Sequence, residues 1–75
     1  MNQGDVITLN DNKKYVVVAT EMVDEVNYVY IIDQNDYSNC MFCKYYDNKL
    51  EKIKDSKTIE KLLNVFYENI KNIKI

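Results

Sequence analysis

The stretch that decides the fold is KYVVVATEMVDEVNYVYIID, residues 14–33, in which two β-forming runs flank an acidic segment. The first run, Lys14–Glu21, holds three consecutive valines, whose branched side chains favour a strand over a helix. This run is continuous rather than alternating, which is typical of a central strand covered on both faces. The second run, Asn27–Asp33, is rich in Tyr, Val and Ile and predicts the next strand. Met22–Val26 lies between them and predicts the turn of a hairpin.

Shorter β-rich runs lie on both sides of this hairpin. The chain has a single glycine, Gly4, and no proline, so its turns have to be built from Asn and Asp, which tolerate positive φ. We expect further strands at Val6–Leu9, Cys40–Tyr46 and Leu50–Lys54, and turns at Asn10–Lys13, Gln34–Asn39 and Asp47–Lys49. The pattern predicts a meander of about five antiparallel strands over residues 5–54.

The last third of the chain changes to a helical period. Its apolar residues recur three or four positions apart, which places them on one face of a helix over residues 56–72. This stripe consists of Ile59, Leu62, Leu63, Phe66, Ile70 and Ile73. The N-cap is Asp55, Ser56 or Thr58, because each can accept a hydrogen bond from the first turn. The sequence therefore predicts one amphipathic helix at the C-terminal end.

A sheet and a helix that each have one apolar face can cover those faces by packing on each other. We therefore predict an α+β fold: a curled antiparallel β-meander of about five strands, SH3-like or small barrel-like, packed on one C-terminal amphipathic helix. We expect the strands to curl around that helix. The 75 residues form a single domain, residues 1–75, because a chain of this length has room for one core.

The composition narrows the classes of function. The net charge is −2, with no Arg and no His. Arg supplies the planar fork that grips phosphates and base edges, so we expect no direct nucleic-acid binding. His is the commonest general base and metal ligand, so we expect no enzyme, no catalytic residue, no cofactor and no metal site.

The composition also bears on location and source. No apolar run approaches the roughly 18 residues that suggest a membrane span, and the N-terminus lacks the pattern of a signal peptide. We expect a cytoplasmic protein that makes no contact with membranes. The frequent Lys, Asn and Ile, with no Arg, Pro or Trp, are typical of a low-GC bacterial genome.

The only two cysteines, Cys40 and Cys43, stand at the C-x-x-C spacing of redox and zinc sites. Their segment is a predicted strand, in which residues three apart point to opposite faces. One face then carries Met41, Cys43 and Tyr45, and the other carries Cys40, Phe42, Lys44 and Tyr46. We interpret both cysteines as reduced and packed as small hydrophobes, with Cys43 buried and Cys40 less protected.

Tyrosines form the second candidate feature, with seven in the chain. Tyr28 and Tyr30 share one strand face because they are two positions apart, and Tyr46 can neighbour them from the next strand. Tyr45 points the other way. We take Tyr28, Tyr30 and Tyr46 as candidate protein-binding residues, because exposed tyrosines anchor protein partners. The alternative is that these rings cover a small core.

Two pairs of carboxylates lie at predicted turns, Asp24 with Glu25 and Asp33 with Asp36. Close carboxylates can bind a divalent cation or act as an acid/base pair. The second pair lacks the long loop and closing Glu of an EF-hand. We therefore interpret both pairs as solvated turn residues.

Three segments carry a family resemblance: DVITLNDNKKYVVV (residues 5–18), NYVYIID (27–33) and LEKIKDSKTIEKLLNVFYENI (50–70). In this order they resemble small bacterial proteins of the family called domain of unknown function 1292. Members open on ITL-D, continue with a Y-V-V-L strand and a hairpin, and place I-D-D-E before a helix. This chain departs from them at Lys54-Asp55-Ser56, where members are more acidic, and in having no Pro after YIID. The resemblance supports the fold and implies no activity, substrate or catalytic residue.

Three functions of different classes fit these observations. We favour a non-catalytic protein-interaction module or homodimer, which binds an unidentified protein or a second copy through a sheet edge or the Tyr-bearing face. One alternative is an acidic inhibitor of phage or mobile-element type that blocks a nucleic-acid-binding partner. The other alternative is a thiol-based redox or metal-binding protein that uses Cys40 and Cys43.

Overall fold

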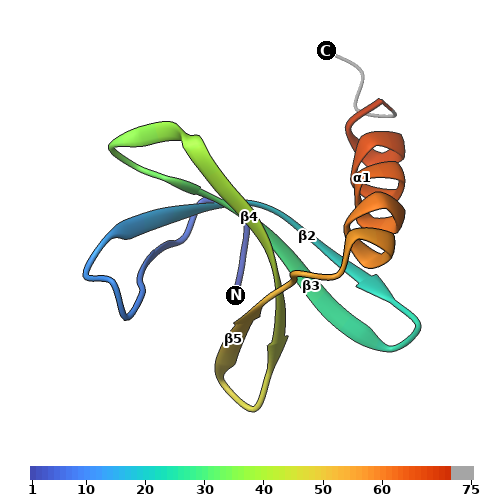
Figure 1. Cartoon of the computed structure of the whole chain (residues 1–75), viewed down its shortest axis with the longest axis horizontal. Helices are drawn as coiled ribbons and strands as arrows, with labels where there is room; N and C mark the ends of the chain where they lie inside the picture. The colour runs from blue at the N-terminus through green and yellow to red at the C-terminus, as the bar shows by residue number, and fades with distance from the viewer. Residues whose placement is uncertain (72–75) are drawn as a thin grey trace.

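The computed structural model describes residues 1–71, with side chains for residues 1–68. Residues 1–71 form five strands and one helix (Figure 1). In chain order these are β1 (Val6–Thr8), β2 (Lys14–Val23), β3 (Val26–Asp33), β4 (Asp36–Tyr46), β5 (Lys49–Lys52) and α1 (Ser56–Lys71). The strands form one antiparallel sheet in sequence order, with β3 in the middle and β1 and β5 at the edges. The predicted α+β meander with a C-terminal helix is confirmed.

Turns built from Asn and acidic residues join the strands. Asp24 and Glu25 (φ 52° and 65°) connect β2 to β3, and Asp47 and Asn48 (φ 49° and 59°) connect β4 to β5. Two successive residues with positive φ make a type I′ turn, whose twist suits a hairpin. Glu25 is the least suited of the four, because positive φ is uncommon outside Gly, Asn and Asp.

One predicted boundary is wrong by more than two residues. β4 begins at Asp36, so the predicted turn Gln34–Asn39 contains only Gln34 and Asn35 outside the strands. The reason is that the Asp33 carboxylate accepts a hydrogen bond from the backbone N–H of Asn35 at 2.8 Å, which closes the turn locally. The other strand boundaries lie within one or two residues of those predicted.

Side chains alternate along the strands and give the sheet two apolar faces. The inner face holds the buried cluster Tyr15, Val17, Val29, Ile31 and Cys43. The outer face holds Phe42 together with Ala19, Val23, Tyr28 and Tyr30. A β-bulge between Val17 and Ala19 shifts the register of β2, so that Tyr15 and Val17 face inward before the bulge and Ala19 and Val23 face outward after it.

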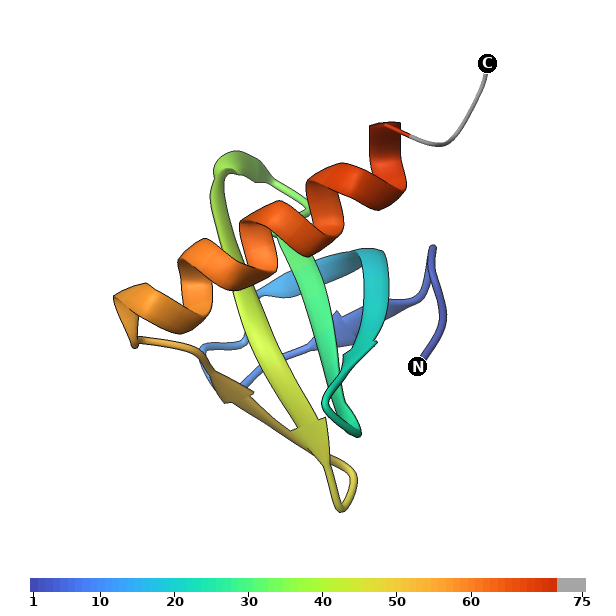
Figure 2. The ribbon, with the colours of Figure 1, turned by 90° about the vertical axis from the view of Figure 1, so that its right-hand side faces the viewer.

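Helix α1 covers the part of the outer face around Phe42 (Figure 2). Leu62 and Phe66 point into the sheet and are 1% and 4% exposed. The Phe66 ring meets Phe42 edge-on with 5.1 Å between centroids, and Tyr30 lies 6.4 Å from it. These aromatic contacts, rather than helix propensity, hold a helix of this length in place.

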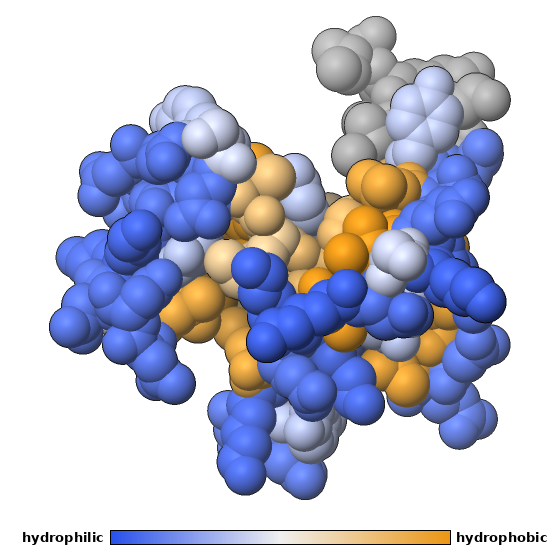
Figure 3. Space-filling model, viewed as in Figure 1, coloured by the Kyte–Doolittle hydropathy of each residue, from blue (hydrophilic) through white to orange (hydrophobic). Residues whose placement is uncertain are grey.

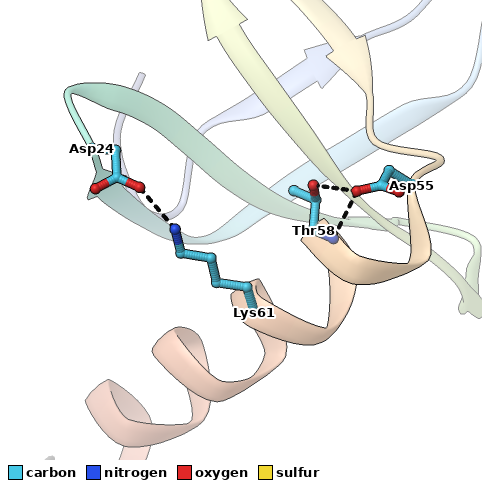
Figure 4. A network of polar contacts seen from close by, with 4 residues as sticks. All are labelled: Asp24, Asp55, Thr58 and Lys61. Atoms are coloured by element: carbon cyan, nitrogen blue, oxygen red, sulfur yellow. Dashed lines mark hydrogen bonds and ion pairs between the residues drawn. The ribbon is translucent and has the colours of Figure 1, made fainter.

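The N-cap of α1 is Asp55, one of the three predicted candidates. Its carboxylate accepts hydrogen bonds from the backbone N–H of Thr58 at 3.0 Å and from the Thr58 hydroxyl at 2.6 Å (Figure 4). Ser56 is the first helical residue. Of the predicted stripe, the side chain of Ile70 and all of Ile73 lie outside the described residues, as does the predicted end of the helix at residue 72.

The expectation that the strands curl around the helix is wrong. The sheet curls away from α1, so that β1 and β5 lie on the side opposite the helix (Figures 1 and 2). Ile7 of β1 and Leu50 of β5 pack on the inner cluster from its two sides. The physical reason is that both faces of the sheet are apolar: one helix covers only one of them, and the sheet covers the other by bending over it. The result is a half-barrel with the helix outside.

Candidate functional site

The half-barrel is open between its two edge strands, where a groove of about 810 Å³ lies. Its lining comes from Met1, β1, the β1–β2 loop, β4, the β4–β5 turn and β5. Its apolar floor consists of Ile7, Leu9, Met41, Cys43 and Leu50. Figure 3 shows hydrophobic residues in the hollow between the β1–β2 lobe and the β4–β5 hairpin, with hydrophilic residues around it. The site is an apolar trough with a polar rim.

The register of β5 determines which of its backbone groups face this opening. The N–H of Ile53 donates to the carbonyl of Phe42 at 2.9 Å, in the same register as the rest of the β4–β5 pair. In an antiparallel ladder alternate residues bond to the neighbouring strand, so every second residue before Ile53 turns its N–H and C=O toward β4. The N–H and C=O groups of Leu50 and Lys52 therefore point toward the open side.

The opposite edge of the groove has the same property. The N–H of Leu9 donates to the carbonyl of Lys13 at 3.1 Å, in the register of the β1–β2 pair. By the same alternation, the backbone groups of Val6 and Thr8 point away from β2. Each side of the groove therefore carries backbone donors and acceptors that a further strand can pair with.

The rim carries more unpaired positive than negative charge. Lys49 and Lys52 lie on the β5 side and Asp11 on the β1 side. The Asp11 carboxylate accepts hydrogen bonds from the backbone N–H of Lys13 and from the Tyr15 hydroxyl, both at 2.9 Å. The N–H of Lys13 in particular holds the pKa of Asp11 below its ordinary value. Among residues 1–68, Lys49 and Lys52 make no ion pair.

A buried polar network lies at one end of the inner face. Asp33 is 4% exposed and accepts hydrogen bonds from the N–H of Asn35 at 2.8 Å and from Nδ2 of Asn39 at 3.2 Å. The same Asn39 amide donates to the Tyr15 hydroxyl at 3.1 Å. The N–H of Asn35 holds the pKa of Asp33 below its ordinary value, and burial raises the pKa of Tyr15. Because both oxygens of Asp33 have partners within the chain, we interpret it as a structural carboxylate.

The three tyrosines predicted to bind a partner lie on the outer face. Tyr28 and Tyr30 are partly buried beneath α1, and the Tyr30 ring lies 4.8 Å from that of Phe42. Tyr46 is 43% exposed, and its hydroxyl donates to Glu51 at 2.9 Å. The helix thus packs on two of the three rings and leaves Tyr46 accessible, and their binding role stays a prediction.

The two cysteines lie on opposite faces of β4, as predicted. Cys43 pairs with Val29 in the inner cluster and is 2% exposed, whereas Cys40 pairs with Ile32 on the outer face and is exposed. Burial raises the pKa of the Cys43 thiol, which disfavours its reactive thiolate form. The C-x-x-C spacing therefore does not bring the two sulfurs to one site.

Three of the four acidic turn residues, Asp24, Asp33 and Asp36, have partners within the fold. Asp24 accepts a hydrogen bond from Nζ of Lys61 at 2.7 Å, which joins the β2–β3 turn to α1 (Figure 4). Asp36 accepts hydrogen bonds from the backbone N–H and the hydroxyl of Ser38, at 3.1 Å and 2.6 Å. Among the described residues, no group of three or more His, Cys, Asp and Glu side chains is placed to hold a metal ion.

The sequence prediction contains no groove, and it assigns no role to Leu50 and Lys52. One signal for them exists in the sequence: the first and last strands of a meander are its edges, and edge strands have free backbone groups. The sequence does not indicate the direction in which the sheet curls. This direction decides whether the two edge strands approach each other over an apolar floor.

No helix among the described residues is long and apolar enough to cross a membrane. Comparison with protein-family models, with curated proteins and with solved structures gives no match to the chain. The resemblance to domain of unknown function 1292 stays a prediction, and the fold and the groove are the observations from which a function has to be inferred.

Proposed function

We propose that this chain is a small, non-catalytic protein-interaction module of the bacterial cytoplasm that binds an extended segment of a partner protein. The observation that carries this proposal is the groove between two unpaired sheet edges. A segment that enters the groove pairs with an edge through backbone hydrogen bonds and buries alternate side chains on Met41 and Leu50. It thereby adds a sixth strand to the half-barrel.

The chemistry of the groove fits an extended peptide better than a reacting small molecule. Backbone donors and acceptors on both sides, at Leu50 and Val6 for example, match the groups that an extended main chain presents. The carboxylate and the thiol at the groove are engaged or buried: Asp11 accepts two hydrogen bonds, and Cys43 belongs to the core. These features support binding without catalysis.

The test removes single backbone donors from the groove. Lys52→Pro deletes an N–H that points to the open side and leaves the bonds between β5 and β4 in place. Thr8→Pro does the same on β1. Ser56→Pro is the matched control, because proline is well tolerated at the first position of a helix.

We expect one of the two groove variants to lose the partner that the wild-type chain captures from its native cells, and the control to keep it. Circular dichroism and thermal unfolding establish that each variant is folded. If both groove variants are folded and capture the same partner as the wild type, the groove is not the binding site.

Self-association is a second candidate, supported by an apolar row on the outer face. Val6, Val16, Ile32 and Cys40 lie directly opposite one another across β1 to β4. Val6 is 52% exposed and Cys40 is exposed, so the row is accessible to a second copy. On this candidate, we expect sedimentation equilibrium to show a dimer of the wild-type chain and a weaker association for Val6→Lys. A wild-type chain that stays monomeric at high concentration contradicts this candidate.

A further inference from the structure

The two edges of the groove are not equivalent, because only one of them carries lysines. Lys49 and Lys52 stand at the ends of β5, with Leu50 and Glu51 between them. A strand that pairs with β5 places its side chains directly opposite these residues, with about 5 Å between Cβ atoms. Opposite charges stabilise such cross-strand pairs, and like charges oppose them.

The β1 edge offers an acidic ligand no such partner. None of its residues, Val6, Ile7 and Thr8, is charged, and the charged lining residue on that side is Asp11. The third charged residue of β5, Glu51, already accepts a hydrogen bond from the Tyr46 hydroxyl at 2.9 Å. Charge complementarity therefore favours β5 as the edge that an acidic segment joins.

We infer that the groove binds an acidic extended segment, with two carboxylates at positions i and i+3 opposite Lys52 and Lys49 and an apolar residue at i+2 opposite Leu50. This inference rests on the proposed function and names its ligand class. The segment runs antiparallel to β5, as every neighbouring pair in the sheet does. Its apolar side chain enters the trough over Met41 and Leu50.

The probe is a blocked, fluorescently labelled peptide with glutamate, threonine, valine and glutamate in that order, flanked by threonines. Two companion peptides replace both glutamates by lysine or by threonine. Fluorescence polarisation measures the affinity of each peptide for the full chain. We expect the glutamate peptide to bind about tenfold more tightly than the lysine peptide, and its affinity to fall as salt is added.

Charge reversal in the protein supplies the second arm. The double variant Lys49→Glu with Lys52→Glu reverses the preference, so that the lysine peptide binds more tightly than the glutamate peptide. The double variant Lys14→Glu with Lys57→Glu is the matched control: it changes the net charge equally at exposed residues outside the groove and leaves the preference as it is.

The outcomes separate the inference from the function on which it rests. If all three peptides bind equally well and Lys52→Pro abolishes that binding, strand addition stands and the acidic specificity is wrong. If none of the peptides binds and the proline variants still capture the native partner, both the inference and the proposed function are wrong.

Discussion

Lys61 in α1 donates a hydrogen bond over 2.7 Å to Asp24 in the β2–β3 turn, across 37 positions of sequence. The two side chains are 56% and 80% exposed. Hydrogen bonding between them lowers the pKa of Asp24 and raises that of Lys61. The pair links α1 to the tip of the β2–β3 hairpin, outside the apolar contact between the helix and the sheet. Because both side chains are exposed, the pair adds little stability.

We therefore expect Lys61→Met to lower the free energy of unfolding only slightly at low salt and not measurably at high salt, where the charges are screened. Urea unfolding at two ionic strengths measures this. Lys57→Met, a change of the same kind at an exposed lysine of the same helix, is the control. A large loss that persists at high salt contradicts this account of the pair.

Removal of the helix cap has a larger effect. Asp55→Ala leaves the N–H of Thr58 without its acceptor, and we expect the thermal midpoint to fall by roughly 4–8 °C. Asp55→Asn retains an acceptor oxygen and keeps most of the stability. Equal midpoints for Asp55→Ala and the wild type would show that the cap is dispensable.

Relief of backbone strain stabilises the β2–β3 turn. Glu25 has φ of 65° and is the second of the two central residues of the type I′ turn, where glycine is favoured. We expect Glu25→Gly to raise the free energy of unfolding by about 0.5–1 kcal/mol. Glu21→Gly, in the neighbouring strand, lowers it by a similar amount. Chemical denaturation of both variants checks the opposite signs, and destabilisation by Glu25→Gly would contradict the strain.

Acid weakens the fold through carboxylates that are hydrogen bonded in the folded state. The pKa of Asp33 is lowered by the N–H of Asn35, so its contribution to stability is present above its ordinary pKa and is lost as pH falls through the lower, folded value. Asp11 and Asp55 act in the same direction, through the N–H of Lys13 and the hydroxyl of Thr58.

We expect Asp33→Asn to flatten the acid limb of the stability curve, since the amide does not titrate. Denaturation from neutral pH to acid measures the slope, and circular dichroism at neutral pH confirms that the variant is folded. A slope equal to that of the wild type removes Asp33 from this explanation.

The two thiols differ in accessibility. We expect a water-soluble thiol reagent to label Cys40 in the native protein and Cys43 only after unfolding, because burial both shields Cys43 and raises its pKa. In Cys40→Ser, native labelling then disappears. Labelling of both cysteines at the same rate in the native state contradicts their placement on opposite faces of β4.

Local chemistry made much of the fold predictable. The valine run of residues 16–18 and the Tyr, Val and Ile of β3 predict strands, because branched and aromatic side chains fit a pleated surface. Asn and Asp mark the turns because they accept positive φ. The alternation across Cys40 and Cys43, with Lys44 on the same face as Cys40, predicts which thiol is buried. Each of these inferences depends on a few neighbouring residues.

By itself, then, the sequence determined the order of the strands, most of the turns, the helix and the faces of β4, since these depend on short-range preferences and periodicity. Tertiary structure alone decided which face the helix covers and which way the sheet curls. Both depend on competition between two apolar faces for one helix. They also depend on the bulge between Val17 and Ala19, which changes the face on which the apolar residues of β2 lie. The helix consequently packs on Tyr28 and Tyr30, and the groove opens between β1 and β5.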